Sequence, residues 1–217
     1  MGKEYEIKVL DIDYKKMVKI LKENGAKKVH KPILFQRLVF HYPDPTIRGF
    51  IRVRDEGKAV TITTKTYKDS KFPEETEVEI TGKFEDGCKL IKSMGIIDKA
   101  FHQSYREKWN HKLAHEITFD WIPGLPLYME IDCISEDKLN KLISLFGIDK
   151  TKIRYGAFDA TYEEYYGIPK DILNDHTPSL TFKNILKEIK PKKNKDLLKK
   201  IYDSYLFNED GTIKKFY

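Results

Sequence analysis

Charged and apolar residues alternate with a period of two over most of the first 167 residues of this 217-residue chain. The segment EYEIKV, residues 4–9, puts two glutamates and a lysine on one parity and aromatic or aliphatic side chains on the other. Successive side chains of a β-strand point to opposite faces of its sheet. The pattern therefore predicts strands that each have one charged face and one apolar face.

The same alternation recurs in six further segments, which are 34–42, 49–67, 75–81, 105–109, 115–121 and 127–132. The Asp-Glu-Gly stretch at 55–57 predicts a tight hairpin, because its glycine can take a positive φ. Three helices are expected between the strands: one from Asp13 toward Gly25, one that ends at Gly95, and one over 135–147. A series of strands with a few helices predicts an α+β fold.

The charged side chains on alternate residues of each strand, called the charged parity below, have two possible positions in such a fold. In an ordinary antiparallel sheet they face water, whereas in a sheet closed into a barrel they line the lumen. The charged parity holds almost no Ser, Asn or Gln, and acid-rich strands alternate with base-rich ones. Like charges in a lumen are costly unless a ligand or ions compensate them. Carboxylates prefer hard cations and Arg and Lys prefer phosphate, so a polyphosphate with divalent metals satisfies both, and we expect the charged side inside.

The charged motifs follow one another in an order that resembles the CYTH superfamily, the triphosphate tunnel metalloenzymes. Glu4-x-Glu6-x-Lys8 is similar to the ExExK signature, and IRVR, TTKT, ETEVEI and YREKW are similar to the basic and acidic strands that follow it. ITFDWIPGLPLYMEID and KIRYGAFDATYEEYYG resemble the last acidic strands and the closing basic–aromatic segment. The resemblance covers residues 3–167. The superfamily includes class IV adenylyl cyclases, thiamine triphosphatases and inorganic triphosphatases.

The resemblance implies an eight-stranded antiparallel β-barrel, with a charged lumen and helices outside, that binds a triphosphate with Mg²⁺ or Mn²⁺. The implied metal ligands are Glu4, Glu6, Asp120, Glu130 and Asp132. The implied phosphate ligands are Lys8, Arg52, Arg54, Lys65, Arg106, Lys108 and Arg154. Glu77 and Glu79 match acidic residues near the metal or the nucleophilic water, and with Lys8 they are the expected catalytic residues. The chain departs from the family at Glu130-Ile131-Asp132, where two glutamates are usual.

Three of these bases are expected to repel one another in the empty protein. Arg52, Arg54 and Arg106 should converge on one polyphosphate, and without it their charges face each other across a partly desolvated space. We therefore expect that removing one of them weakens triphosphate binding without lowering stability.

A lumen of this kind serves two reactions. Attack by water on the terminal phosphate gives a triphosphatase, and attack by a ribose 3′-hydroxyl on the α-phosphate gives a cyclase that releases pyrophosphate. Hydrolysis is favoured, since the sequence shows no recognisable adenine pocket; conversion of ATP to cyclic AMP is the alternative. A protein that only binds a nucleotide or polyphosphate, or one that processes RNA 5′-triphosphates, is also compatible with the motifs. The aromatic residues that are either core or stacking residues are Phe35, Phe40, Tyr42 and Trp121.

The composition changes near Gly167. From Lys170 onward 11 lysines stand against 7 acidic residues, in a chain of net charge +6. We predict a triphosphate tunnel domain over 1–167 and a basic helical extension over 168–217. The run KEIKPKKNKDLLKK is suited either to nucleic acid or to the solvated face of short helices, and we favour the helices. Their apolar residues, expected to pack on the barrel, are Ile185, Leu186, Leu197, Leu198 and Ile201.

Other features bound the class of protein. The N-terminus lacks an apolar signal-peptide core and no apolar run approaches the ~20 residues that span a bilayer, so a cytoplasmic protein without membrane contact is expected. Cys88 and Cys133 give no disulfide framework and should be buried thiols. His111 and His115 have a spacing suited to zinc on a helix, but they flank an expected hairpin, which argues against a zinc site.

Overall fold

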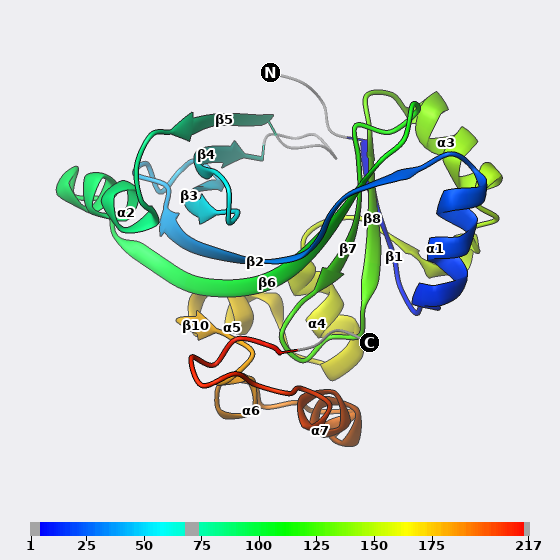
Figure 1. Ribbon diagram of the computed structural model, residues 1–217. Coiled ribbons are helices and arrows are strands. Elements are labelled where there is room, and N and C mark those ends of the chain that lie inside the picture. The colour runs from blue at the N-terminus through cyan, green and yellow to red at the C-terminus, as the bar shows by residue number, and fades with distance from the viewer. Residues whose placement is uncertain (1–4, 68–73, 215–217) are drawn as a thin grey trace.

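The computed structural model of the chain describes residues 5–67 and 74–214 and is drawn in Figure 1. The strands are β1 (Tyr5–Val9), β2 (Lys27–His41), β3 (Gly49–Asp55), β4 (Val60–Thr66), β5 (Glu74–Ile80), β6 (Asp98–Asn110), β7 (Glu116–Trp121), β8 (Tyr128–Cys133), β9 (Ile153–Arg154) and β10 (Ser179–Leu180). The helices are α1 (Tyr14–Glu23), α2 (Phe84–Ser93), α3 (Glu136–Leu145), α4 (Phe158–Tyr166), α5 (Lys170–Asp175), α6 (Ile185–Glu188) and α7 (Lys195–Asp203).

The strands of the described residues form one sheet, in the order β5-β4-β3-β2-β6-β7-β8-β1-β9, with β10 beside β6. All neighbours are antiparallel except β10, which runs parallel to β6. The α+β prediction is confirmed. Within the described ranges the sheet is a path of nine strands from β5 to β9, with β10 beside β6, and no pairing between β5 and β9 is present to close it.

The two long strands β2 and β6 bend the sheet into a cup. They are 15 and 13 residues long, well beyond the segments predicted for them, and they pair with each other along most of their length. Their register shifts between Lys28 and His30, between His30 and Ile33, and between Val39 and Phe40. Such irregularities bend a strand and increase its twist. Figure 1 shows β3, β4 and β5 on one side of the bend and β1, β7 and β8 on the other.

The predicted hairpin and helices are present. Gly57 has φ +78° in the β3–β4 turn, and its backbone N–H donates to Asp55 Oδ1 over 2.7 Å. Asp13 caps α1 by accepting a hydrogen bond from the backbone N–H of Lys16. Ser135 caps α3 in the same way through Lys138.

The apolar parity of the strands packs against the helices. One cluster joins β1, β7 and β8 to α1 and α3, and it includes the fully buried residues Ile7, Met129 and Ile131. Another places Val53 and Phe40 under α2. In Figure 1 α1 and α3 lie outside the wall formed by β1 and β8, so the charged parity faces the inside of the cup.

The residues after Gly167 pack on the same sheet. β10 pairs with β6 at Phe101 and His102, and Phe182 and Ile213 belong to the main apolar cluster. Of the five apolar residues expected to pack, Ile185 and Leu198 are buried, Leu197 and Ile201 are partly buried, and Leu186 is exposed. The division of the chain at residue 167 stays a prediction.

Two further expectations concern cysteines and membrane spans. Cys88 and Cys133 are both free and buried, as predicted. Among the helices of the described ranges, none has the length and apolar character needed to cross a bilayer.

Candidate functional site

The inside of the cup is lined by the charged parity of neighbouring strands. The register places Glu6 opposite Asp132 and Lys8 opposite Glu130 on β1 and β8. On the far wall it places Arg52 opposite Thr63 and Arg54 opposite Thr61, with the glutamates of β5 next in line. Most of the predicted ligands therefore share one continuous surface.

Lys8 lies at the centre of the acidic wall. Its Nζ is 2.8 Å from Glu6 Oε1 and 3.1 Å from Glu130 Oε1, and it also donates to the carbonyl oxygen of Gly156 over 2.5 Å. The Lys8 side chain is only 5% exposed, so its charge depends on these partners. The two carboxylates are thereby held side by side around one ammonium group.

In this crowded site the pKa values of the two carboxyl groups shift in opposite directions. Burial, and then the charge of Glu130, raises the pKa of Glu6 to about 7. Burial opposes ionisation of Glu130 as well, but Lys8 and Arg106 outweigh it and lower its pKa to about 2. The raised pKa of Glu6 thus reflects first its burial and then its closeness to a second carboxylate.

Arg106 joins the acidic wall to the floor of the cup. Its guanidinium binds Asp120 through Nε and Nη2, Glu116 through Nη1 at 3.1 Å, and Glu130 through Nη2 at 2.5 Å. Lys108 on the same strand pairs with Glu116. The expected repulsion between Arg106 and the other arginines is wrong for this residue, because three carboxylates surround it.

The opposite wall, called the basic wall below, carries Arg52, Arg54 and Lys65, each paired with a glutamate. Arg52 Nη2 lies 3.5 Å from Glu75 and 3.3 Å from Glu77, and Lys65 Nζ lies 2.7 Å from Glu75. Arg54 pairs with Glu56 and, at 3.4 Å, with Glu77. The Nε atoms of Arg52 and Arg54 are buried and have no hydrogen-bond partner in the described part of the chain. Both guanidiniums thus keep donor capacity for a ligand.

Glu77 ties these basic groups together. It accepts a hydrogen bond from the Thr63 hydroxyl at 2.6 Å and contacts Arg52 and Arg54. Its burial favours the neutral form, but these donors prevail and lower the pKa of Glu77. Glu79, two residues along β5, is exposed, and its side chain forms no hydrogen bond or ion pair within the described ranges.

The sequence-based prediction missed Arg37 on β2. Arg37 stands directly opposite Arg54 on β3 and opposite His102 on β6. Its guanidinium lies 5.0 Å from the ring of Phe158, and Arg37 has no ion pair among the described residues. The sequence offers little indication of this role, because Phe35 and Val39 lie on the same face of β2 as Arg37 and make that face look apolar.

Phe35 forms the apolar floor between the two walls. The guanidinium carbons of Arg54 and Arg106 lie 5.7 Å and 5.9 Å from its ring centre. Of the other aromatic candidates, Phe40 and Trp121 are core residues and Tyr42 packs partly buried beside α2.

The remaining predicted residues occupy the rim or fall outside the described part. Asp132 Oδ2 lies 2.9 Å from His115 Nδ1. Arg154 stands opposite Lys8 on the edge strand β9 and pairs with Glu164 at 2.6 Å. Glu4 lies outside the described residues, so its role as a metal ligand stays a prediction.

Within the described ranges, no group of three or more His, Cys, Asp or Glu side chains has an arrangement that could already hold a metal ion. His111 instead contacts the Asn24 carbonyl oxygen at 3.2 Å. The acidic wall does supply oxygen donors with excess negative charge, which is the donor chemistry that Mg²⁺ and Mn²⁺ prefer.

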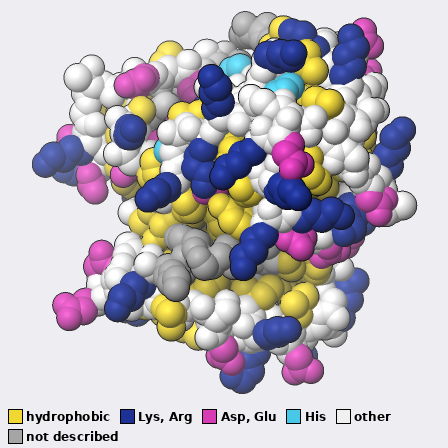
Figure 2. Space-filling view, turned by 45° about the vertical axis from the view of Figure 1, so that its right-hand side comes forward, with side chains coloured by type: hydrophobic (Ala, Val, Ile, Leu, Met, Phe, Trp, Pro, Cys, Tyr) yellow, Lys and Arg dark blue, Asp and Glu magenta, His cyan; other side chains and the backbone are white. Residues whose placement is uncertain are grey.

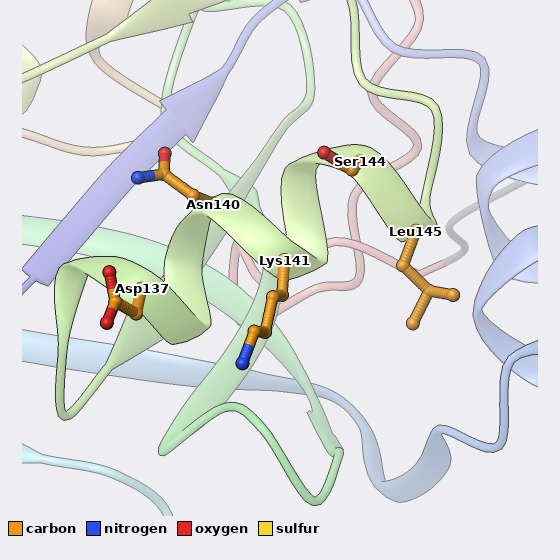
Figure 3. A pocket seen from close by; sticks show the side chains of 5 residues that line it. All are labelled: Asp137, Asn140, Lys141, Ser144 and Leu145. Atoms are coloured by element: carbon orange, nitrogen blue, oxygen red, sulfur yellow. The ribbon is translucent and has the colours of Figure 1, made fainter.

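The outer surface carries a shallow hollow and mixed charges. A shallow hollow lies on the outside of α3, lined by Asp137, Asn140, Lys141, Ser144 and Leu145 (Figure 3). Figure 2 shows basic and acidic side chains mixed over the lower part of the molecule, where α6 and α7 lie in Figure 1. This mixing agrees with a solvated helical surface more than with a nucleic-acid stripe.

The sequence matches no protein-family model and no curated protein. Solved structures are similar. A conserved hypothetical protein of Pyrococcus furiosus is 20% identical with a TM-score of 0.58, over 71% of this chain and 97% of that one. A proposed adenylate cyclase of Vibrio parahaemolyticus is 13% identical with a TM-score of 0.61, over 73% and 97%. A proposed adenylyl cyclase of Hippeastrum, described as having a dominant triphosphatase activity, is 14% identical with a TM-score of 0.51, over 76% and 96%.

Proposed function

We propose that this chain, which has the fold of the CYTH or triphosphate tunnel superfamily, hydrolyses a triphosphate bound inside the cup with the help of Mg²⁺ or Mn²⁺. The observation that carries the proposal is the separation of charge on that surface. Acidic residues gather on β1, β7 and β8, and arginines with unused donors gather on β2 and β3. A polyphosphate with a divalent cation has the complementary arrangement.

The acidic wall fits a divalent cation. Among the described residues, Glu6, Glu116, Asp120 and Glu130 pair with three cationic side chains, Lys8, Arg106 and Lys108, and Asp132 lies 2.9 Å from His115 Nδ1. Glu6, Glu130 and Asp132 would hold the ion, and Glu4 precedes them on the same parity. When bound, the metal would neutralise charge on the phosphate oxygens.

The basic wall would hold the phosphate chain. Arg52 and Arg54 each keep an Nε donor without a partner in the described residues, and Arg106 and Lys65 are the further phosphate ligands on the neighbouring strands. In hydrolysis a water oxygen attacks the terminal phosphorus, the bond to the leaving diphosphate oxygen breaks, and the water loses a proton. Glu79 is suited to accept that proton, whereas Glu77, with its lowered pKa, is suited to orient the arginines.

A product assay tests this function. The purified protein is incubated with tripolyphosphate, ATP and other triphosphates, with Mn²⁺, Mg²⁺ or excess chelator, and the products are separated. Orthophosphate that depends on the divalent metal is the expected result. Absence of turnover for every triphosphate in both metals would overturn the proposal.

The same assay decides the alternatives. Cyclic AMP and pyrophosphate from ATP would identify a class IV-type cyclase, an activity suggested by the similar Vibrio parahaemolyticus structure. Tight binding without any product would leave a nucleotide- or polyphosphate-binding protein. Much faster turnover of RNA 5′-triphosphate than of free triphosphates would favour an RNA substrate.

A further inference from the structure

Arg37 is a partly buried cation that forms no ion pair with the described residues. Its Nε atom is buried without a hydrogen-bond partner, and no carboxylate in the described residues pairs with it. Burial lowers the pKa of Arg37 to about 10, and the charges of Arg54 and Arg106 act in the same direction. Since arginine keeps its proton at physiological pH, this charge must be tolerated or met by a ligand.

One end of the cup beside Arg37 is covered by α4. The ring of Phe158, the first residue of α4, lies against the Arg37 guanidinium and contacts His102 edge-on. The helix is fixed in place, because the hydroxyls of Tyr162 and Tyr166 donate to the carbonyl oxygens of Pro123 and Gly124.

A hydrogen bond from Lys8 fixes the segment before α4. The Lys8 ammonium donates to the carbonyl oxygen of Gly156, just beyond β9, the strand that pairs with β1. A bulky group on a phosphate at this end would have to displace Phe158 from Arg37. A bare phosphate oxygen could instead bind the N–H groups at the edge of the guanidinium without moving Phe158.

We propose that Arg37 binds the unsubstituted terminal phosphoryl group of the triphosphate, so that any organic group points toward the end of the cup away from α4. This inference rests on the proposed function and deepens it. A planar guanidinium forms charge-assisted hydrogen bonds to phosphate oxygens, and a terminal phosphoryl group carries the most charge of the chain. The substrate class is therefore a triphosphate with at least one free end.

Calorimetric titration with tripolyphosphate tests the role of Arg37. Arg37→Gln should weaken binding at least tenfold and leave the melting temperature of the ligand-free protein unchanged or higher. Arg48→Gln is the matched control, because Arg48 also lies over an aromatic ring, that of Tyr67, but its side chain is exposed. Arg37→Lys keeps the charge without the planar fork and should give an intermediate loss, which provides a second variant if Arg37→Gln does not fold.

A dinucleoside triphosphate tests the orientation, because both of its end phosphates are substituted. It should bind the wild type more weakly than tripolyphosphate, and its affinity should not change in Arg37→Gln. An equal loss for both ligands would overturn the assignment to the free end.

The two proposals fail in different ways. If Arg52→Gln weakens tripolyphosphate binding and the Arg37 variants do not, the proposed function stands and the role of Arg37 is wrong. If the wild type binds no triphosphate at all, the proposed function itself fails.

Discussion

Arg106 binds Asp120 through two parallel hydrogen bonds, Nε to Oδ1 at 2.7 Å and Nη2 to Oδ2 at 3.0 Å. Asp120 is 1% exposed and also accepts from the Thr118 hydroxyl at 2.5 Å. A two-point pair of this kind fixes both side chains in one plane. The arginine predicted as a phosphate ligand is thus also the main partner of a buried carboxylate.

We expect Arg106→Gln to lower the free energy of unfolding by about 3–5 kcal/mol, because it leaves Asp120 and Glu130 buried with one cation fewer. Urea denaturation measures the loss. Lys108→Gln on the same face is the control: Lys108 is 34% exposed, so its pair with Glu116 should contribute about 0–1 kcal/mol. Equal stability of the two variants would show that Arg106 is not a structural partner.

Glu6→Gln should separate metal binding from folding. We expect Mn²⁺ to raise the melting temperature of the wild type, since a ligand that binds only the folded state stabilises it, and to have no such effect on the variant. Without metal at pH 8 the variant should melt no lower than the wild type, because the pKa of Glu6 is raised to about 7 and its charged form is disfavoured in the folded state.

Glu164→Gln, which removes an exposed carboxylate, is the control for this experiment. Thermal melting with and without Mn²⁺ gives the comparison directly. An equal Mn²⁺ shift in wild type and Glu6→Gln would argue against Glu6 as a metal ligand.

The period-two pattern was sufficient to predict which residues share the inner surface. Parity alone assigns Glu6, Lys8 and Glu130 to one face, and pairing of the strands brings them into contact. Parity does not determine curvature. The bends of β2 and β6 come from shifts of register between strands that are far apart in the sequence, so the pattern alone does not determine how strongly the sheet curves.

Glu107 shows a second limit of the pattern. It falls on the apolar parity of β6 and is 1% exposed in the core. Its carboxylate accepts from Trp109 Nε1 at 2.8 Å and from Lys28 Nζ at 2.6 Å, and both oxygens contact the Tyr14 hydroxyl at 3.1 Å. Two of these donors come from other elements, so only the folded chain reveals why a glutamate is tolerated there.

His102 should make the protein sensitive to acid. It is 5% exposed and both ring nitrogens lack hydrogen-bond partners in the described residues. Burial, followed by the charges of Arg37 and Lys99, lowers its pKa to about 3. The unfolded chain therefore binds the proton more readily than the folded chain, and stability is lost as the pH falls from about 6.5 toward 3.

At pH 5 this one group should cost about 2 kcal/mol relative to neutral pH. The free energy of unfolding, measured by urea at pH 7.5 and pH 5, should fall less in His102→Leu than in the wild type by that amount. His41→Gln removes an exposed histidine and should keep the wild-type difference. An unchanged difference in His102→Leu would show that His102 is protonated in the folded protein.

Phe182 should couple the segment after Gly167 to the main core. It is 1% exposed, and its ring centre lies 5.3 Å from those of Tyr105 on β6 and Tyr205 after α7. Removing a buried phenylalanine side chain leaves a cavity and costs about 3–5 kcal/mol. We expect Phe182→Ala to lower the free energy of unfolding by this amount, in a single transition.

The two tryptophans of the chain report on this coupling, because Trp109 and Trp121 belong to the same cluster as Phe182 but lie in the predicted tunnel domain. If their fluorescence follows one urea transition that moves to lower urea in Phe182→Ala, the segment after residue 167 is part of one cooperative unit. Leu186→Ala, at an exposed position of α6, should shift the transition by less than about 0.5 kcal/mol. A tryptophan transition that does not move in Phe182→Ala would mean that residues 168–217 unfold separately, and that the strands keep their core without them.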